Sequence, residues 1–186
     1  MPRRRPDRSL RRVATALTAL AVIGVACGRS STSPDATSSE IADGKDAIAR
    51  TAAEGFAPRS VVFLDIERME RMPQAMRDYH RAWARTLLRD GSFLPGVYVH
   101  AHNAQAVHDD LKAEFVAAGV TDDPRVWVAT GRGFDESKAP QDVGFTFAGM
   151  WQGMIDVARA VADIKLPVDV NVSSWISPSD PGTAVD

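Results

Sequence analysis

Two acidic residues that follow a short apolar run are the residues of this chain best suited to chemistry. The apolar residues 61–64 lead directly into Asp65-Ile66-Glu67. A bounded apolar run predicts a buried strand, and alternate residues of a strand project to one face, so Asp65 and Glu67 should share a face. Two crowded carboxylates should have pKa values that are pushed apart. Glycoside hydrolysis requires such a pair, with one acid protonated and the other ionised.

Helix and strand patterns alternate around this pair. Periodicity predicts helices at residues 45–54, 72–89 and 104–118, and strands at residues 59–67, 96–100, 126–130, 145–152 and 168–172. Residues 154–164 are ambiguous and favour a helix over a strand. Helices that connect strands favour right-handed crossovers and a mostly parallel sheet, so we expect an α/β fold.

The first 27 residues have the layout of an export signal. Six arginines lie within the first 12 residues, an apolar stretch covers residues 13–26, and Cys27 follows. The stretch is too short to span a membrane and is typical of a secretory signal. Gly24-Val25-Ala26 before Cys27 resembles a bacterial lipobox, although Gly24 stands where Leu is usual. We therefore expect a lipoprotein of the cell envelope, anchored through a lipid on Cys27, with simple secretion as the alternative.

Composition divides the rest of the chain into three parts. Residues 28–43 are rich in Ser, Thr, Asp and Ala and predict a flexible linker, residues 44–176 form the expected domain, and residues 177–186 predict a disordered tail. Without residues 1–27 the chain has 16 basic and 23 acidic residues, a net charge of −7. It has no basic stripe of the kind that binds nucleic acid. Cys27 is the only cysteine, so no internal disulfide can form.

Several short phrases, taken together, resemble a known group of bacterial domains. The order and spacing are similar to those of glycoside hydrolase-like domains related to family-25 lysozymes, over residues 44–175. The matching phrases are VFLDIE at residues 62–67, LPGVY at residues 94–98, WVA at residues 127–129, WQ at residues 151–152 and VDVNV at residues 168–172. The resemblance implies part of a (β/α) TIM-type barrel, with about five mostly parallel strands and flanking helices. It covers only the C-terminal half of the barrel, because a complete barrel needs roughly 200–250 residues.

The resemblance also implies roles for individual residues. Glu67 would be the general acid/base, and Asp65 would stabilise positive charge or hold an acetamido group of the substrate. Asp169 would lie at the rim of the site. The substrate would be a cell-wall glycan of the peptidoglycan type. The expected substrate-binding residues are Tyr98, His100, Trp151, Gln152 and Asn171, and no organic cofactor is expected.

Two other functions remain open from the sequence. The missing early strands are consistent with a non-catalytic binding or scaffold module, and an open sheet edge could pair with a second copy of the chain. A less favoured alternative is a metal-dependent hydrolase in which His100 and His102 hold a divalent ion beside the acidic pair. The sequence alone does not decide whether the protein is an enzyme.

Overall fold

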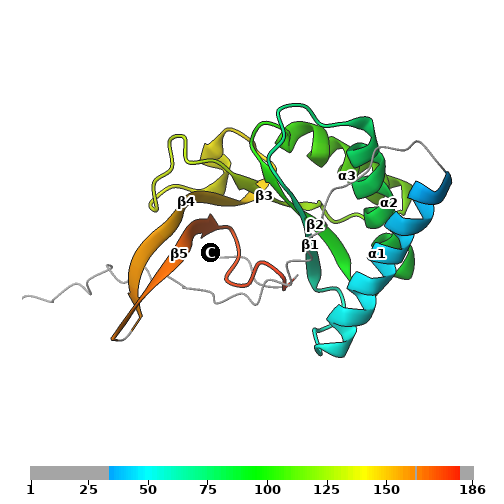
Figure 1. Cartoon of the computed structure of the whole chain (residues 1–186), viewed down its shortest axis with the longest axis horizontal. Helices are drawn as coiled ribbons and strands as arrows, with labels where there is room; N and C mark the ends of the chain where they lie inside the picture. Colours follow the sequence, from blue (N-terminus) through cyan, green and yellow to red (C-terminus); the bar gives the residue numbers. More distant parts are fainter. Residues whose placement is uncertain (1–33, 162, 181–186) are drawn as a thin grey trace, which may run out of the picture.

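The sheet of this protein is a half-barrel of five strands (Figure 1). A computed structural model describes residues 34–161 and 163–180. The strands lie in the order of the sequence: β1 (Val61–Ile66), β2 (Leu94–His100), β3 (Arg125–Ala129), β4 (Ala148–Val161) and β5 (Ile164–Ser173). β1 to β4 are parallel, and β5 is antiparallel to β4. The expected α/β partial barrel is therefore confirmed.

Three helices lie along one side of the sheet (Figure 1): α1 (Pro34–Ala53), α2 (Gln74–Asp90) and α3 (Ala104–Ala117). A short 3-10 helix, η1 (Pro140–Val143), precedes β4. The valines at positions 97, 99, 126 and 128 are almost completely buried in the same core cluster as α2 and α3. Their neighbours Tyr98 and Trp127 are half-buried, because strand side chains alternate between faces. The sheet thus has a helix-covered outer face and a concave inner face. None of the described helices has the length and apolar character needed to cross a membrane.

Residues 154–164, for which a helix was favoured, are mostly strand, so that prediction was wrong. β4 continues to Val161 and pairs with β5 as a long hairpin. The pairing with β5 satisfies the backbone of this segment, and local sequence could not reveal it. The ladder is interrupted between Gln152 and Val157, where Asp156 has a φ of 54°.

Helix α1 begins at Pro34, so residues 34–43 are not the flexible linker that composition predicted. The helix is held here by contacts with α2, since the Tyr79 hydroxyl donates a hydrogen bond to the Asp43 carboxylate at 3.0 Å. Glu40 is also buried. The predicted export signal, Cys27 and the remaining linker residues 28–33 lie outside the described residues.

The segment that follows β5 returns across the amino ends of the strands. The Val61 N–H donates to the Ser179 carbonyl at 2.8 Å, and the Arg125 guanidinium donates to the carbonyls of Pro178 and Asp180 at 2.5 and 2.9 Å. Residues 177–180 are thus ordered, and the prediction of a disordered tail was wrong for them. Residues 181–186 lie outside the described part of the chain.

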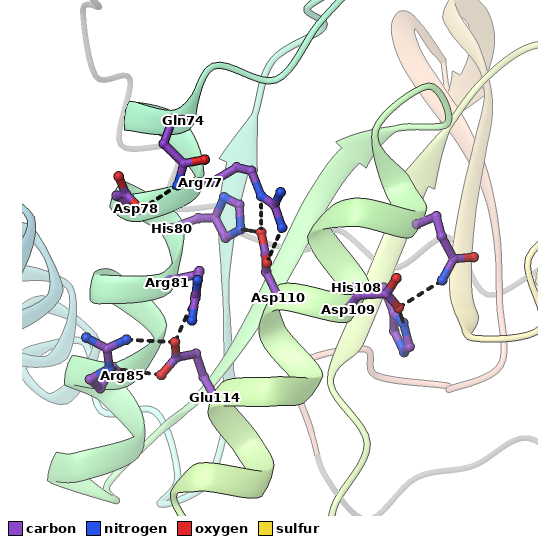
Figure 2. A network of polar contacts seen from close by, with 11 residues as sticks. Gln74, Arg77, Asp78, His80, Arg81, Arg85, His108, Asp109, Asp110 and Glu114 are labelled. Carbon is purple, nitrogen blue, oxygen red and sulfur yellow. Dashed lines mark hydrogen bonds and ion pairs between the residues drawn. The ribbon is translucent and has the colours of Figure 1, made fainter.

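Charged side chains join α2 to α3 (Figure 2). The buried Glu114 carboxylate accepts hydrogen bonds from Arg81 at 3.0 Å and from Arg85 at 2.9 and 2.7 Å. The hydrogen bond from Arg85 lowers the pKa of Glu114 most strongly, and burial opposes this. Glu114 therefore stabilises the fold as a carboxylate.

A second carboxylate on α3 makes a similar connection (Figure 2). Asp110 accepts two hydrogen bonds from Arg77, at 2.8 and 2.6 Å, and one from Nε2 of His80 at 3.0 Å. Burial lowers the pKa of His80, so the imidazole donates to Asp110 as a neutral ring. Together the two carboxylates fix the spacing of the helices behind β2.

We predict that Glu114→Gln lowers the free energy of unfolding by about 1–2 kcal/mol at neutral pH, because two partly exposed arginines lose a buried charged acceptor. The pKa of Glu114 is lowered in the folded state, so its contribution is present above the ordinary glutamate pKa and is lost as pH falls through the folded value. Urea denaturation at neutral and acidic pH measures the difference. Asp109→Asn, on an exposed face of the same helix, is the control. An equal loss at both pH values would contradict the prediction.

Candidate functional site

Asp65 lies at the start of a row of side chains that crosses the concave face. The register pairs Asp65 with Tyr98 and Tyr98 with Trp127 across β1, β2 and β3. The Tyr98 and Trp127 rings meet edge to face, with centroids 5.1 Å apart. Phe63 extends the row, with its ring 6.1 Å from that of Trp127. Gly96 makes room for Phe63, because a Cβ at this position would lie 2.8 Å from the phenyl ring. The first three strands therefore present one carboxyl group beside three aromatic rings.

A relay of hydrogen bonds connects this row to the opposite end of the sheet. The Tyr98 hydroxyl donates to Oε1 of Gln152 at 2.5 Å, and Nε2 of Gln152 donates to Oδ2 of Asp169 at 2.8 Å. The other oxygen of Asp169 accepts the backbone N–H of Asp156 at 3.1 Å. Asp169 thus closes the interruption in the β4–β5 ladder and also faces the site.

The carboxyl groups gather around Tyr98. Burial raises the pKa of Tyr98 to about 12, and the charges of Asp65, Glu67 and Asp169 contribute in that order. Burial also raises the pKa of Asp65, and the charge of Glu67 adds to this effect. The strand register places Asp65 opposite Tyr98, and Asp169 is connected to the Tyr98 hydroxyl through Gln152. Two of the expected acids, Asp65 and Asp169, are thus connected to Tyr98, and Glu67 follows Asp65 by two residues.

Asp65 and Glu67 have different surroundings although they lie two residues apart. Glu67 is exposed, just beyond the end of β1. Asp65 is half-buried, and its Oδ1 atom is buried without a hydrogen-bond partner among the described residues. A carboxylate with few donors holds a proton more tightly than an exposed one. Asp65 is therefore the sheltered acid of the two, and Glu67 is the accessible one.

Asn171 and Trp127 are joined on the same face. The indole N–H of Trp127 donates to Oδ1 of Asn171 at 2.9 Å. Trp127 is absent from our expected site residues, although the sequence contains the signal: it lies between Val126 and Val128, which are both buried under the helices. The same alternation places Tyr98 between two buried valines. A valine on each side of an aromatic residue thus marks the ring that faces the concave side.

Trp151 does not line the concave face, contrary to our expectation. It is completely buried, its indole N–H donates to the Thr130 carbonyl at 2.7 Å, and its ring packs edge to face against Phe134. The register pairs it with Val128, which faces the helices. Trp151 therefore stabilises the sheet behind the site.

His100 is the last residue of β2, so it lies at the carboxyl ends of the strands, as Glu67 does. Its Nδ1 accepts the backbone N–H of His102 at 3.3 Å, and burial, with the nearby charge of Arg68, lowers its pKa. In the described part of the chain, no three His, Cys, Asp or Glu side chains come close enough to hold a metal ion. The contact between His100 and His102 is therefore local, and the two side chains do not form part of a metal site in the described residues.

A surface hollow of about 360 Å³ lies at the opposite end of the strands, beside the amino ends of β3 and β4. Its lining includes His108, Arg125, Phe147 and Trp175. Arg125 lies 4.3 Å from the centre of the Trp175 ring, and its hydrogen bonds to the returning segment hold it there. None of the acids around Tyr98 lines this hollow, so it is separate from the candidate site.

Comparisons with known proteins agree with this architecture. The model of a family described as "Rv2525c-like, glycoside hydrolase-like domain" matches residues 14–172. A 1.07 Å crystal structure of an uncharacterized B. stearothermophilus protein is similar, with a TM-score of 0.51 and 19% sequence identity. The similarity covers 74% of this chain and 63% of that one, so this chain spans less than two thirds of the other protein. At this identity the likeness shows the fold alone.

No curated protein is similar enough to this chain to count as a match. The family match nevertheless includes every strand as far as Val172 in β5, together with the acids around Tyr98. This chain therefore belongs to the Rv2525c-like glycoside hydrolase-like family.

Proposed function

We propose that this protein binds a cell-wall glycan of the peptidoglycan type on its concave face and cleaves a glycosidic bond there with Glu67 and Asp65. The observation that carries the proposal is the pairing of a sheltered and an exposed carboxyl group beside Tyr98. The carboxyl ends of parallel strands are where barrel enzymes place their catalytic groups. The proposed reaction requires no organic cofactor.

The concave face offers the two kinds of contact that sugars need. The rings of Tyr98 and Trp127 provide apolar surface for the faces of sugar rings. Asn171 offers an exposed amide group and His100 lies at the rim, while the buried Gln152 holds the Tyr98 hydroxyl.

The carboxyl pair can carry out the cleavage with one shared proton. Glu67 gives a proton to the leaving oxygen as the bond from that oxygen to the anomeric carbon breaks. Water then adds to the anomeric carbon, and its proton returns to the pair. Asp65 shelters the shared proton between turnovers and is placed to hold the acetamido group of an amino sugar. Asp169 contributes through Gln152, because both of its oxygens already accept hydrogen bonds.

The rival proposal is a glycan-binding module without catalysis. It is favoured by the two hydrogen bonds that Asp169 accepts as a structural group, and by the sheet of the described residues, which has five strands where a complete barrel has eight. A second copy of the chain could supply the missing side of the barrel. Both proposals share the concave face, so they differ only in whether Glu67 and Asp65 turn over a substrate.

We predict that the purified protein releases reducing ends from peptidoglycan and chitin-type oligomers, and that Glu67→Gln lowers the rate at least about 100-fold, because proton transfer to the leaving oxygen is lost. The control is Glu54→Gln, an exposed position beyond the end of α1. A glycan pull-down runs beside the assay. Binding by wild type and Glu67→Gln without release by either would identify a binding module, and an absence of binding would contradict both proposals.

We predict that Trp127→Ala weakens glycan binding roughly tenfold, because an aromatic face contributes about 1 kcal/mol or more to a stacked contact. Trp151→Phe, at the buried tryptophan, is the matched control and should leave binding unchanged. Titration calorimetry with a chitin-type oligomer measures both. Equal binding by wild type and Trp127→Ala would place the glycan elsewhere.

We predict that the rate falls as pH rises through the raised pKa of Asp65, because the pair then loses its shared proton. Below that pKa the proton is present, so activity lies on the acid side. The measurement is kcat/KM from about pH 3 to about pH 8. In Asp65→Asn this descending limb should be lost or displaced, and an unchanged limb would assign it to another group.

Export and anchoring are a separate part of the proposal, supported by the arginines, the apolar stretch and the lipobox-like residues before Cys27. We predict that cells expressing the full chain incorporate labelled fatty acid into the protein, and that Cys27→Ser abolishes the labelling because the thiol that accepts the lipid is missing. Metabolic labelling with fractionation measures this. Secretion of an unlabelled, shortened wild-type chain would favour the alternative of simple secretion.

A further inference from the structure

Gln152 accepts the hydrogen bond that the Tyr98 hydroxyl donates. The hydroxyl donates to Oε1 of Gln152 at 2.5 Å, and the amide cannot turn over without losing its own donation to Asp169 at 2.8 Å. Asp169 is held in turn by the backbone of Asp156. Each donor therefore has an assigned acceptor, and the direction of the relay from Tyr98 to Asp169 is fixed.

Asp65 therefore receives no hydrogen bond from the Tyr98 hydroxyl. Tyr98 is the cross-strand partner of Asp65, so the two side chains leave neighbouring strands on the same face. Yet Oδ1 of Asp65 is buried and has no hydrogen-bond partner within residues 34–161 and 163–180. A buried carboxyl oxygen normally accepts a hydrogen bond, and a hydroxyl group on the neighbouring strand is a suitable donor. In this structure the Tyr98 hydroxyl donates to Gln152 instead.

The other groups that face Asp65 do not replace the missing donor. Glu67 follows on the same strand, and Asp169 lies across the face on β5 and contributes to the same cluster of negative charge. His100, at the end of β2, has a lowered pKa caused first by burial, so it is neutral at ordinary pH, and its Nδ1 is an acceptor. The groups named here around Asp65 are thus acids or hydrogen-bond acceptors, and the one hydroxyl among them, that of Tyr98, donates to Gln152.

We propose that Gln152 is a positioning residue that holds the Tyr98 hydroxyl away from Asp65, so that the buried Oδ1 of Asp65 stays without a donor and the protonated form of Asp65 is favoured. We call the hydrogen bond from Tyr98 to Gln152 the lock. Its effect on catalysis rests on the proposed glycosidase function, but the lock itself is a property of the free protein. Without it, Tyr98 would donate to Asp65 and stabilise the carboxylate. Asp65 would then lose its proton at a lower pH.

The test follows the protonation of Asp65 directly by carbon-detected NMR of side-chain carboxyl groups, with Asp65→Asn to assign the signal. In Gln152→Met, which keeps the volume of the side chain, the titration midpoint of Asp65 should move to lower pH. In Tyr98→Phe, which has no hydroxyl to donate, it should not move to lower pH. The double variant Tyr98→Phe/Gln152→Met should behave as Tyr98→Phe does. Asn171→Leu, which breaks the neighbouring bond from Trp127, is the control for general disturbance of the face.

The outcomes separate the lock from the proposed function. An unchanged midpoint in Gln152→Met, or an equal fall in the double variant, would overturn the lock whether or not the protein cleaves glycan. A fall in Gln152→Met that Tyr98→Phe abolishes would support the lock even if no cleavage is found. If the wild type does cleave glycan, the descending limb of its pH profile should also move to lower pH in Gln152→Met.

Discussion

The alternation of side chains along β1, β2 and β3 determines where this protein can place its chemistry. Valines on the outer face pack against α2 and α3, and each contributes roughly 1.5–3 kcal/mol when fully buried. A slip of one residue in the register would turn these valines toward the concave face and Asp65, Tyr98 and Trp127 toward the helices. The core therefore fixes the register, and the register fixes the carboxyl group beside the two rings. The charged contacts between α2 and α3 act on the same layer from behind, because they hold the helices against which the valines pack.

Much of this arrangement could be predicted from the sequence because its signals are local. The apolar run before Asp65 predicted β1, and the short apolar segment at residues 96–100 predicted β2. The long hairpin was not predictable, since residues 154–161 become a strand only through pairing with β5. Trp151 was misplaced for a related reason: the irregular register between β3 and β4 decides which face it occupies, and the ladder shows that it pairs with the buried Val128. The part of α1 around Asp43 is held by its contact with Tyr79, which joins segments far apart in the chain and is not visible in the local sequence.

β5 connects the architecture to the site. Asp169 holds the interrupted part of the hairpin through Asp156 and orients Gln152 at the same time, so the position of the hairpin and the direction of the polar relay depend on each other. Asn171, two residues later, holds the indole of Trp127. The antiparallel strand thus supplies the concave face with polar groups at the place where a longer barrel would continue. This is how a half-barrel of the glycoside hydrolase-like family can keep an ordered set of side chains on an open face.

The central claim is that glycan binds on the concave face and not at the hollow near Arg125. The indole N–H signals of the tryptophans in a nitrogen-15 NMR spectrum test it most directly, because Trp127, Trp151 and Trp175 report on the concave face, the core and the opposite hollow. On addition of a chitin-type oligomer, the account predicts that the Trp127 signal moves while those of Trp151 and Trp175 stay in place. Movement of the Trp175 signal with an unchanged Trp127 signal would contradict it.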